Sequence, residues 1–144
     1  MKIRTRSLVK KAGHPLVIVM GDDRASVSEL ISVLEKAHIE AGAVRNLKKF
    51  KEILPQAVVI TEGAGGKGWD LSSQIRDESN VPILMVGSSN SELAWVKAAA
   101  YGIDCYLVKP FAYRELAARI RALVRRYDGS LLDLQKPHAH KVHV

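Results

Sequence analysis

The sequence has little of several features that would place it in a particular class of protein. It contains a single cysteine, Cys105, which excludes an internal disulfide and suits a reducing compartment. No apolar run approaches the roughly 20 residues that a membrane-spanning helix needs, and residues 1–14 lack the apolar core of a secretion signal. The chain is therefore expected to be a cytoplasmic protein with no membrane partner.

Acidic residues are absent from residues 1–14, which are rich in lysine and arginine and carry much of the formal net charge of +7. A second basic cluster follows at residues 119–126. Such clusters can attract nucleic acid, but they also occur on solvated tails and on the wet faces of helices. Neither zinc-finger spacing nor a basic sheet interleaved with aromatics accompanies them. The sequence favours a basic tail and a helix surface over direct nucleic-acid contact.

The stretch "AVVITEGAGGKGWDL", residues 57–71, places a glycine-rich segment directly after an apolar run. A Walker-type phosphate loop would need Ser or Thr after Lys67, where Gly68 stands. Three of the glycines match the spacing of a dinucleotide fingerprint, but they do not follow the first strand, and no acid stands about 20 residues further on. The segment is predicted to be a loop, with no nucleotide cofactor and no metal site.

Short β-favouring runs alternate with longer helical patterns along the whole chain. The runs lie at 15–20, 39–44, 57–61, 82–87 and 105–109. The apolar stripes expected on the helices are Val27, Leu30, Ile31 and Leu34; Leu47, Phe50 and Leu54; Leu71 and Ile75; Leu93, Val96 and Ala100; and Leu116, Ile120 and Leu123. Five such units predict an α/β fold, a doubly wound (βα)5 parallel sheet. Its functional crevice should lie at the carboxyl ends of the strands.

Polar residues follow four of the predicted strands. They are Asp22 and Asp23, Thr61 and Glu62, Ser88 after Gly87, and Lys109. Carboxylates hold hard cations and an amine counters phosphate charge, so this set is of the kind that serves a magnesium and phosphoryl site.

At these positions the sequence resembles the receiver domains of two-component response regulators. The matching segments are "MGDDRAS", "ILPQAVVIT", "VPILMVGSS" and "GIDCYLVKPFAYRELAARIRALVRRY". The resemblance implies a flavodoxin-like, CheY-like sheet with strand order 2-1-3-4-5 and a signalling role in place of an enzymatic one. It divides the chain into a basic N-terminal tail (1–14), a receiver-like domain (15–127) and a linker or the start of an effector domain (128–144).

Several positions depart from the receiver pattern. The resemblance implies that Thr61 stands where the family has its phosphate-accepting aspartate, and that Gly87 replaces the Ser or Thr that contacts the phosphoryl group, with Ser88 next to it. An unactivated hydroxyl is a far weaker nucleophile than a carboxylate. Glu62 is the nearest acid, but strand alternation points its side chain to the opposite face. The sequence therefore predicts a pseudo-receiver that works without phosphorylation.

The remaining pocket positions are partly kept. The resemblance implies that Gly21 takes the first acid position and leaves Asp22 and Asp23, which predicts magnesium affinity weaker than millimolar. Lys109 and Tyr106 match the family's lysine and its switch aromatic. Without a phosphorylated aspartate to bind, Lys109 is expected to pair with Asp22 or Asp23 in a structural role.

Receivers of the OmpR type dimerise through their fourth helix, fifth strand and fifth helix, using charge pairs across a two-fold axis. Positions that match this set are Asp104, Glu115, Arg119 and Arg126. Cys105 replaces the acid that would meet Arg119, and Trp95 replaces a basic residue. Trp95 lies about 200° around the helix from Leu93. We expect it to point outward as part of an interface; the alternative is a Trp partly buried under a loop.

The last residues, "GSLLDLQKPHAHKVHV", resemble the opening strands of the winged-helix domain that follows the receiver in OmpR-type regulators, although a polar tail is the simpler alternative. The leading interpretation is the dimerising regulatory half of an OmpR-type, DNA-binding transcriptional regulator. The alternative is a stand-alone adaptor that contacts a sensor kinase or another regulator. An enzyme ranks third, because no nucleophile paired with a base is present.

Overall fold

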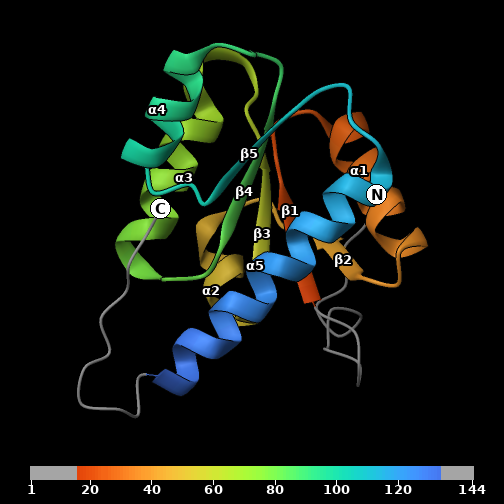
Figure 1. Ribbon diagram of the computed structural model, residues 1–144, viewed down its shortest axis with the longest axis vertical. Helices are drawn as coiled ribbons and strands as arrows, with labels where there is room; N and C mark the ends of the chain where they lie inside the picture. The colour runs from red at the N-terminus through yellow and green to blue at the C-terminus, as the bar shows by residue number, and fades with distance from the viewer. Residues whose placement is uncertain (1–15, 134–144) are drawn as a thin grey trace.

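The computed structural model describes residues 16–133, which form a five-stranded parallel sheet with helices on both faces (Figure 1). The strands are β1 (Leu16–Met20), β2 (Glu40–Ala43), β3 (Ala57–Thr61), β4 (Ile83–Gly87) and β5 (Cys105–Val108), in the order β2-β1-β3-β4-β5. The helices are α1 (Arg24–Lys36), α2 (Leu47–Ile53), α3 (Lys67–Glu78), α4 (Glu92–Ala100) and α5 (Tyr113–Asp133), with the 3-10 turn η2 (Ala64–Gly66) before α3. The predicted (βα)5 fold and strand order are confirmed.

The central strands are buried along their whole length. Every residue of β1, β3 and β4 is buried, and nearly all are apolar, as in a parallel sheet covered on both faces. Alternate side chains serve two cores: Val17 and Val59 face α1 and α5, whereas Ile18 and Ile60 face α2, α3 and α4. In Figure 1, α3 and α4 lie to the left of the sheet, α1 lies to the right, and α5 crosses in front.

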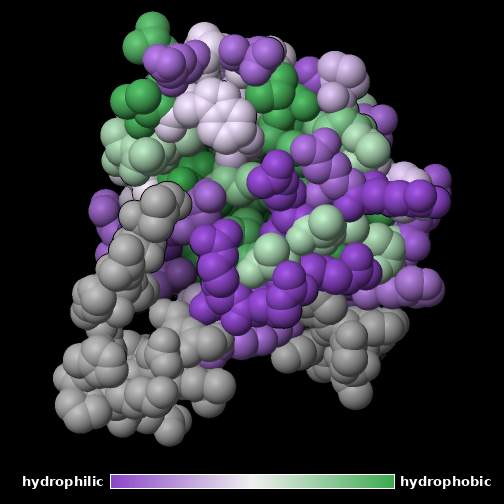
Figure 2. Space-filling view, viewed as in Figure 1, coloured by the Kyte–Doolittle hydropathy of each residue, from purple (hydrophilic) through white to green (hydrophobic). Residues whose placement is uncertain are grey.

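Helix α4 contradicts the predicted apolar stripe. Leu93 is 79% exposed and Val96 is 63% exposed, and Ala100 is also exposed. Its buried residues are Ala94 and Ala98, which join a core cluster that also holds the rings of Trp69 and Tyr106. Since these rings fill the space beneath the helix, methyl-sized side chains fit on its inner face and the larger ones turn outward. Figure 2 accordingly shows hydrophobic atoms at the upper left, over α4.

The carboxyl ends of helices α2 and α5 add two observations, the first of which contradicts a prediction. Leu54, expected in the core stripe of α2, is 80% exposed because it ends that helix in the left-handed conformation. Helix α5 continues to Asp133, so residues 128–133, predicted to belong to a linker or to the start of an effector domain, extend this helix. The predicted tail 1–14 and residues 134–144 lie outside the described part of the chain.

Acidic and basic residues balance each other in the described part of the chain. Residues 16–133 contain equal numbers of acidic and basic residues, so the formal net charge of +7 comes from residues 1–15 and 134–144. Within 16–133, no helix combines the length and the apolar composition needed to cross a membrane.

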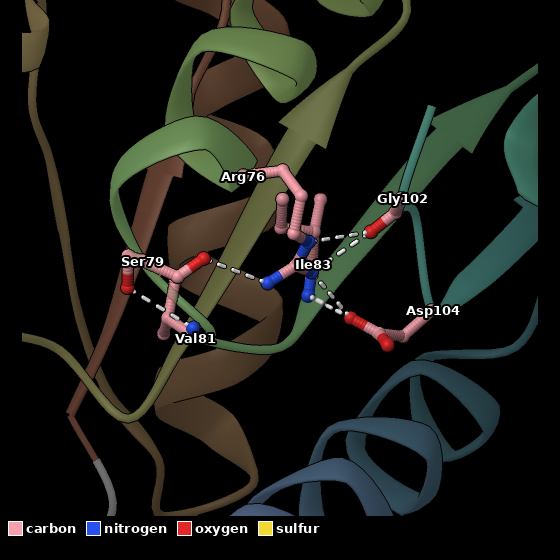
Figure 3. A network of polar contacts seen from close by, with 6 residues as sticks. All are labelled: Arg76, Ser79, Val81, Ile83, Gly102 and Asp104. Carbon is pink, nitrogen blue, oxygen red and sulfur yellow. Dashed lines mark hydrogen bonds and ion pairs between the residues drawn. The ribbon is translucent and has the colours of Figure 1, made fainter. Parts of the chain in front are cut away.

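Arg76 on α3 ties three segments together at the amino-terminal end of β4 (Figure 3). Its Nε and Nη2 donate to the carbonyl oxygen of Gly102, and its Nη1 donates to the carbonyl oxygen of Ser79 at 3.0 Å. Nη2 also meets Asp104 Oδ2 at 2.8 Å, and the same oxygen accepts from the Ile83 backbone N–H at 2.8 Å. The Arg76 and Asp104 side chains are only 24% and 37% exposed. Arg76 therefore connects α3 to the segment between α4 and β5.

We expect Arg76→Met to lower the free energy of unfolding by about 2 kcal/mol, because hydrogen bonds to charged groups contribute about 1.5–3 kcal/mol and this side chain makes several. Urea unfolding followed by circular dichroism measures the change. Lys51→Met is the matched control: it removes the cation of the Lys51–Glu78 pair, whose side chains are 50% and 41% exposed, and should cost under about 1 kcal/mol. Equal losses in the two variants would contradict the role of Arg76.

Candidate functional site

The polar residues predicted at the strand ends do meet at one edge of the sheet. Parallel pairing aligns Met20 of β1 with Ile60 of β3, and Thr61 of β3 with Val86 of β4. Gly21 directly follows β1, and Glu62 directly follows the adjacent strand β3. The Glu62 backbone N–H donates to the Val86 carbonyl oxygen at 2.9 Å. On the next strand, the Lys109 backbone N–H donates to the Gly87 carbonyl oxygen at 2.8 Å. These contacts place the ends of β1, β3, β4 and β5 side by side.

Thr61 is buried at this edge of the sheet. The residue is 6% exposed, and its Oγ1 has no hydrogen-bond partner in the structure of residues 16–133. A Cβ atom added to Gly21 would lie 2.2 Å from this Oγ1. Gly21 is therefore the residue that allows the Thr61 hydroxyl its position, and an acid at 21 would collide with it.

The two remaining acids of the first turn have different surroundings. Asp23 caps α1: its carboxylate accepts from Ser26 Oγ at 2.5 Å and from the Ala25 backbone N–H at 3.2 Å. These hydrogen bonds, led by the one from Ser26, hold the pKa of Asp23 below its usual value. Asp22 is exposed, and it makes no hydrogen bond or ion pair within residues 16–133.

The expected pairing of Lys109 with Asp22 or Asp23 was wrong. Lys109 is exposed, and none of the ion pairs among the described residues includes it. Its charge acts on Asp23 only as a minor contribution to the lowered pKa of that carboxyl. The reason is that Asp23 already turns toward the first turn of α1 to cap it.

A magnesium ion, which the receiver resemblance would suggest at this edge, does not fit the donor set. Mg²⁺ prefers oxygen ligands in octahedral geometry and is held in proteins by carboxylates. Asp23 is engaged in capping, Thr61 supplies no carboxylate, and Asp22 alone is left. Among the described residues, no group of three or more His, Cys, Asp or Glu side chains could hold a metal.

The glycine-rich segment forms η2 and the start of α3. Gly63, Gly65 and Gly66 have positive φ, and α3 begins at Lys67 without a side-chain cap. Lys67 and Gly68 border a pocket of about 190 Å³ beside Gly21. Because ligand pockets usually measure about 300–1,000 Å³, this volume argues against a nucleotide here, as the residue spacing did.

Glu62 takes part in contacts that the sequence did not predict. The Tyr106 hydroxyl donates to Glu62 Oε1 at 2.9 Å, and Trp69 Nε1 donates to Glu62 Oε2 at 3.1 Å. Tyr106 is 2% exposed, and its pKa is raised, first by burial and then by the hydrogen bond to Glu62. Strand alternation already placed Glu62 opposite to Thr61, but the sequence gave no sign of which residues its carboxylate would meet.

Gly87 makes room for this arrangement. A Cβ atom added to Gly87 would lie 2.2 Å from the Tyr106 hydroxyl oxygen and 2.3 Å from Glu62 Oε1. Any side chain at 87 would therefore displace one of the two groups. Ser88, next to it, is exposed and makes no hydrogen bond within the described residues.

The residues predicted for a dimer interface lie on α4, on α5 and, in the case of Asp104, in the segment directly before β5. Trp95 is 49% exposed; its ring meets Tyr106 edge-on with centroids 5.8 Å apart. Asp104 belongs to the Arg76 network, and Glu115 pairs with Arg119 of its own helix at 3.6 Å. Arg126 is exposed. Burial raises the pKa of the Cys105 thiol, and the positive charges of Arg119 and Arg126 offset this rise only in part.

Comparisons with known proteins agree with this geometry. The family model of the response regulator receiver domain matches residues 17–121. The sensory transduction protein RegX3 of Mycobacterium bovis is 34% identical over 115 residues, which is 76% of this chain and 51% of RegX3. The DNA-binding response regulator MtrA of Mycolicibacterium paratuberculosis is 30% identical over 138 residues, 87% of this chain and 61% of MtrA. The chain thus spans about half to three fifths of these curated relatives.

Solved structures show the same fold. A two-component response regulator from Clostridium difficile superposes with a TM-score of 0.64 and 26% identity, covering 76% of this chain and 96% of that one. The receiver domain of the Francisella response regulator 1452 gives a TM-score of 0.65 at 22% identity, covering 78% of this chain and 98% of that one.

We expect Thr61→Val to leave the free energy of unfolding unchanged or to raise it by up to about 1 kcal/mol. The substitution removes a buried hydroxyl without a partner and keeps the side chain's shape. Ser72→Ala is the contrasting control, since Ser72 is fully buried and its Oγ donates to the Gly68 carbonyl oxygen at 2.9 Å. That variant should lose about 1 kcal/mol in urea unfolding. A loss of more than about 1 kcal/mol in Thr61→Val would show that its hydroxyl has a partner.

Proposed function

The chain belongs to the response regulator receiver domain family, and from that premise we propose that it is a receiver that works without phosphorylation. In this proposal it forms the dimerising regulatory half of an OmpR-type transcriptional regulator. DNA contact would then belong to a winged-helix domain that follows the receiver in such proteins. Support for the OmpR type comes from similarity to RegX3 and MtrA, the second of which is named as DNA-binding.

The observation that carries the proposal is the paired change at positions 21 and 61. The acceptor position holds a threonine whose hydroxyl is enclosed beside Gly21. A phosphoryl group would have to be transferred to a hydroxyl oxygen that is buried among its neighbours. Activation of the hydroxyl would also need a base, and the carboxylate of Glu62, the next residue in the chain, accepts from Tyr106 and Trp69 instead.

Dimerisation through α4, β5 and α5 is supported by the surface of α4. Leu93, Trp95 and Val96 expose large apolar side chains on one short helix. Exposed apolar groups of this size commonly mark protein contacts, and tryptophan is enriched at the centres of interfaces. The charged residues contribute less, because Glu115 and Arg119 already pair within α5 and the Asp104 carboxylate is engaged by Arg76. The proposed energy source is therefore apolar burial.

Incubation with acetyl phosphate or beryllofluoride and magnesium should leave the mass, the tryptophan fluorescence and the oligomeric state of this chain unchanged. The physical reason is the missing carboxylate nucleophile at position 61. Mass spectrometry, fluorescence and sedimentation measure the three properties. A receiver that carries aspartate at this position, treated in parallel, is the control. An acid-labile phospho-adduct on this chain would reject phosphorylation independence.

Trp95→Ala should shift the chain from dimer to monomer in sedimentation. Truncating a buried interface tryptophan commonly costs about 2 kcal/mol or more, roughly a 30-fold rise in Kd. Glu115→Ala is the control on the same face and should change Kd much less, because exposed ion pairs contribute under about 1 kcal/mol. Added salt should weaken association only modestly, since screening acts on charges and leaves apolar burial intact.

Two outcomes would reject dimerisation through the face formed by α4, β5 and α5. One is a wild-type chain that stays monomeric at high micromolar concentration, and the other is a Trp95→Ala variant that dimerises as before. Either result would favour the alternative, an adaptor that binds a sensor kinase or another regulator through protein contacts.

A further inference from the structure

The carboxylate of Glu62 lies where four parts of the chain meet. It follows β3, it accepts from Trp69 on α3, and it accepts from Tyr106 on β5. The Tyr106 hydroxyl oxygen in turn accepts from the Ser89 backbone N–H at 3.3 Å, in the connection that leads to α4. Both carboxylate oxygens are thus in use, each by a donor from a different element.

Both rings that donate to Glu62 also support α4. Trp69 and Tyr106 stack with centroids 6.0 Å apart, and they are 3% and 2% exposed. From α4, Trp95 meets the Tyr106 ring edge-on, and Lys97 Nζ lies 4.6 Å from the centroid of the Trp69 ring. The inner face of α4 offers only alanines besides these contacts. The position of the helix therefore depends on where the two rings lie.

We propose that the Glu62 carboxylate acts as an internal ligand that holds Tyr106 inward and, through Tyr106 and Trp69, fixes α4 and its exposed apolar residues in one position. Without the carboxylate, a phenol hydroxyl and an indole N–H would be left buried with too few acceptors, which favours movement of the rings toward water. Gly87 is the second requirement, because a side chain there would occupy the space of the Tyr106 hydroxyl. The inference concerns the single chain and does not rest on dimerisation.

Glu62→Gln in the full chain tests the proposal with little change of shape. Tyr106 and Trp69 donate to different oxygens of the carboxylate, whereas the amide places an NH2 donor where one of these oxygens was, so the two hydrogen bonds cannot both keep their present geometry. We expect the backbone amides of residues 92–100 to exchange hydrogen about tenfold faster or more, the effect of one lost hydrogen bond to a charged group. The exchange of α1, on the other face of the sheet, should stay as in the wild type. Near-ultraviolet circular dichroism of the tryptophans should change together with α4 exchange.

Gly87→Ala and Ser88→Ala form a matched pair at adjacent positions, the last residue of β4 and the first residue after it. The first places a Cβ against the Tyr106 hydroxyl and Glu62, and should loosen α4 as Glu62→Gln does. The second changes an exposed side chain without a hydrogen bond in the described residues, and should leave α4 exchange unaltered. If Gly87→Ala fails to fold, Tyr106→Phe keeps the ring and removes only the hydroxyl that reaches Glu62.

Three results would overturn the inference: unchanged α4 exchange in Glu62→Gln, equal effects of Gly87→Ala and Ser88→Ala, or acceleration of α1 to the same degree as α4. The last would mean that Glu62 contributes to overall stability alone. All measurements use dilute chain without phosphodonor, so they fail or succeed separately from the tests of phosphorylation and of dimerisation.

Discussion

Because the strands of the sheet are buried on both faces, polar side chains can gather only at the strand ends, and the connections there must be short. This constraint places Gly21, Thr61, Gly87 and Lys109 at the same edge of the sheet, whatever chemistry they perform. Along each strand, successive side chains point to opposite faces of the sheet. Thr61 and Glu62, neighbours in the chain, consequently have unrelated surroundings: one is enclosed beside Gly21, and the other joins the aromatic rings below α4.

The fold could be read from the sequence because its strongest signals are the apolar strands. All five predicted runs agree with the observed strands to within a residue at each end, and the buried stripes of α1 and α5 are as expected. The prediction of the buried face of α4 was wrong for an identifiable reason. Its sequence, "ELAWVKAAA", is apolar nearly all round, so periodicity cannot tell which side is inside. The choice is made by Trp69 and Tyr106, which come from other elements and already fill the core.

The candidate site was predicted in part. Its location and the identity of Thr61, Gly87 and Tyr106 follow from spacing and from the receiver resemblance. The partners do not, because hydrogen bonds between residues far apart in sequence depend on side-chain placement. Glu62 reaches Tyr106 across 44 positions, and Asp104 reaches Arg76 across 28. In both cases a carboxylate that looked available from its sequence position is occupied within the chain. Lys109 shows the opposite case: it was expected to pair with Asp22 or Asp23, and its side chain is exposed instead.

The two glycines at the strand ends have a consequence for how this chain can evolve. A side chain gained at 21 meets the Thr61 hydroxyl, and one gained at 87 meets both Tyr106 and Glu62. A mutation at either glycine therefore creates a crowded site unless the neighbouring side chain has changed first or changes with it. Such dependence between sites is epistasis: whether a larger residue is tolerated at 21 or 87 depends on which residues stand at 61, 62 and 106.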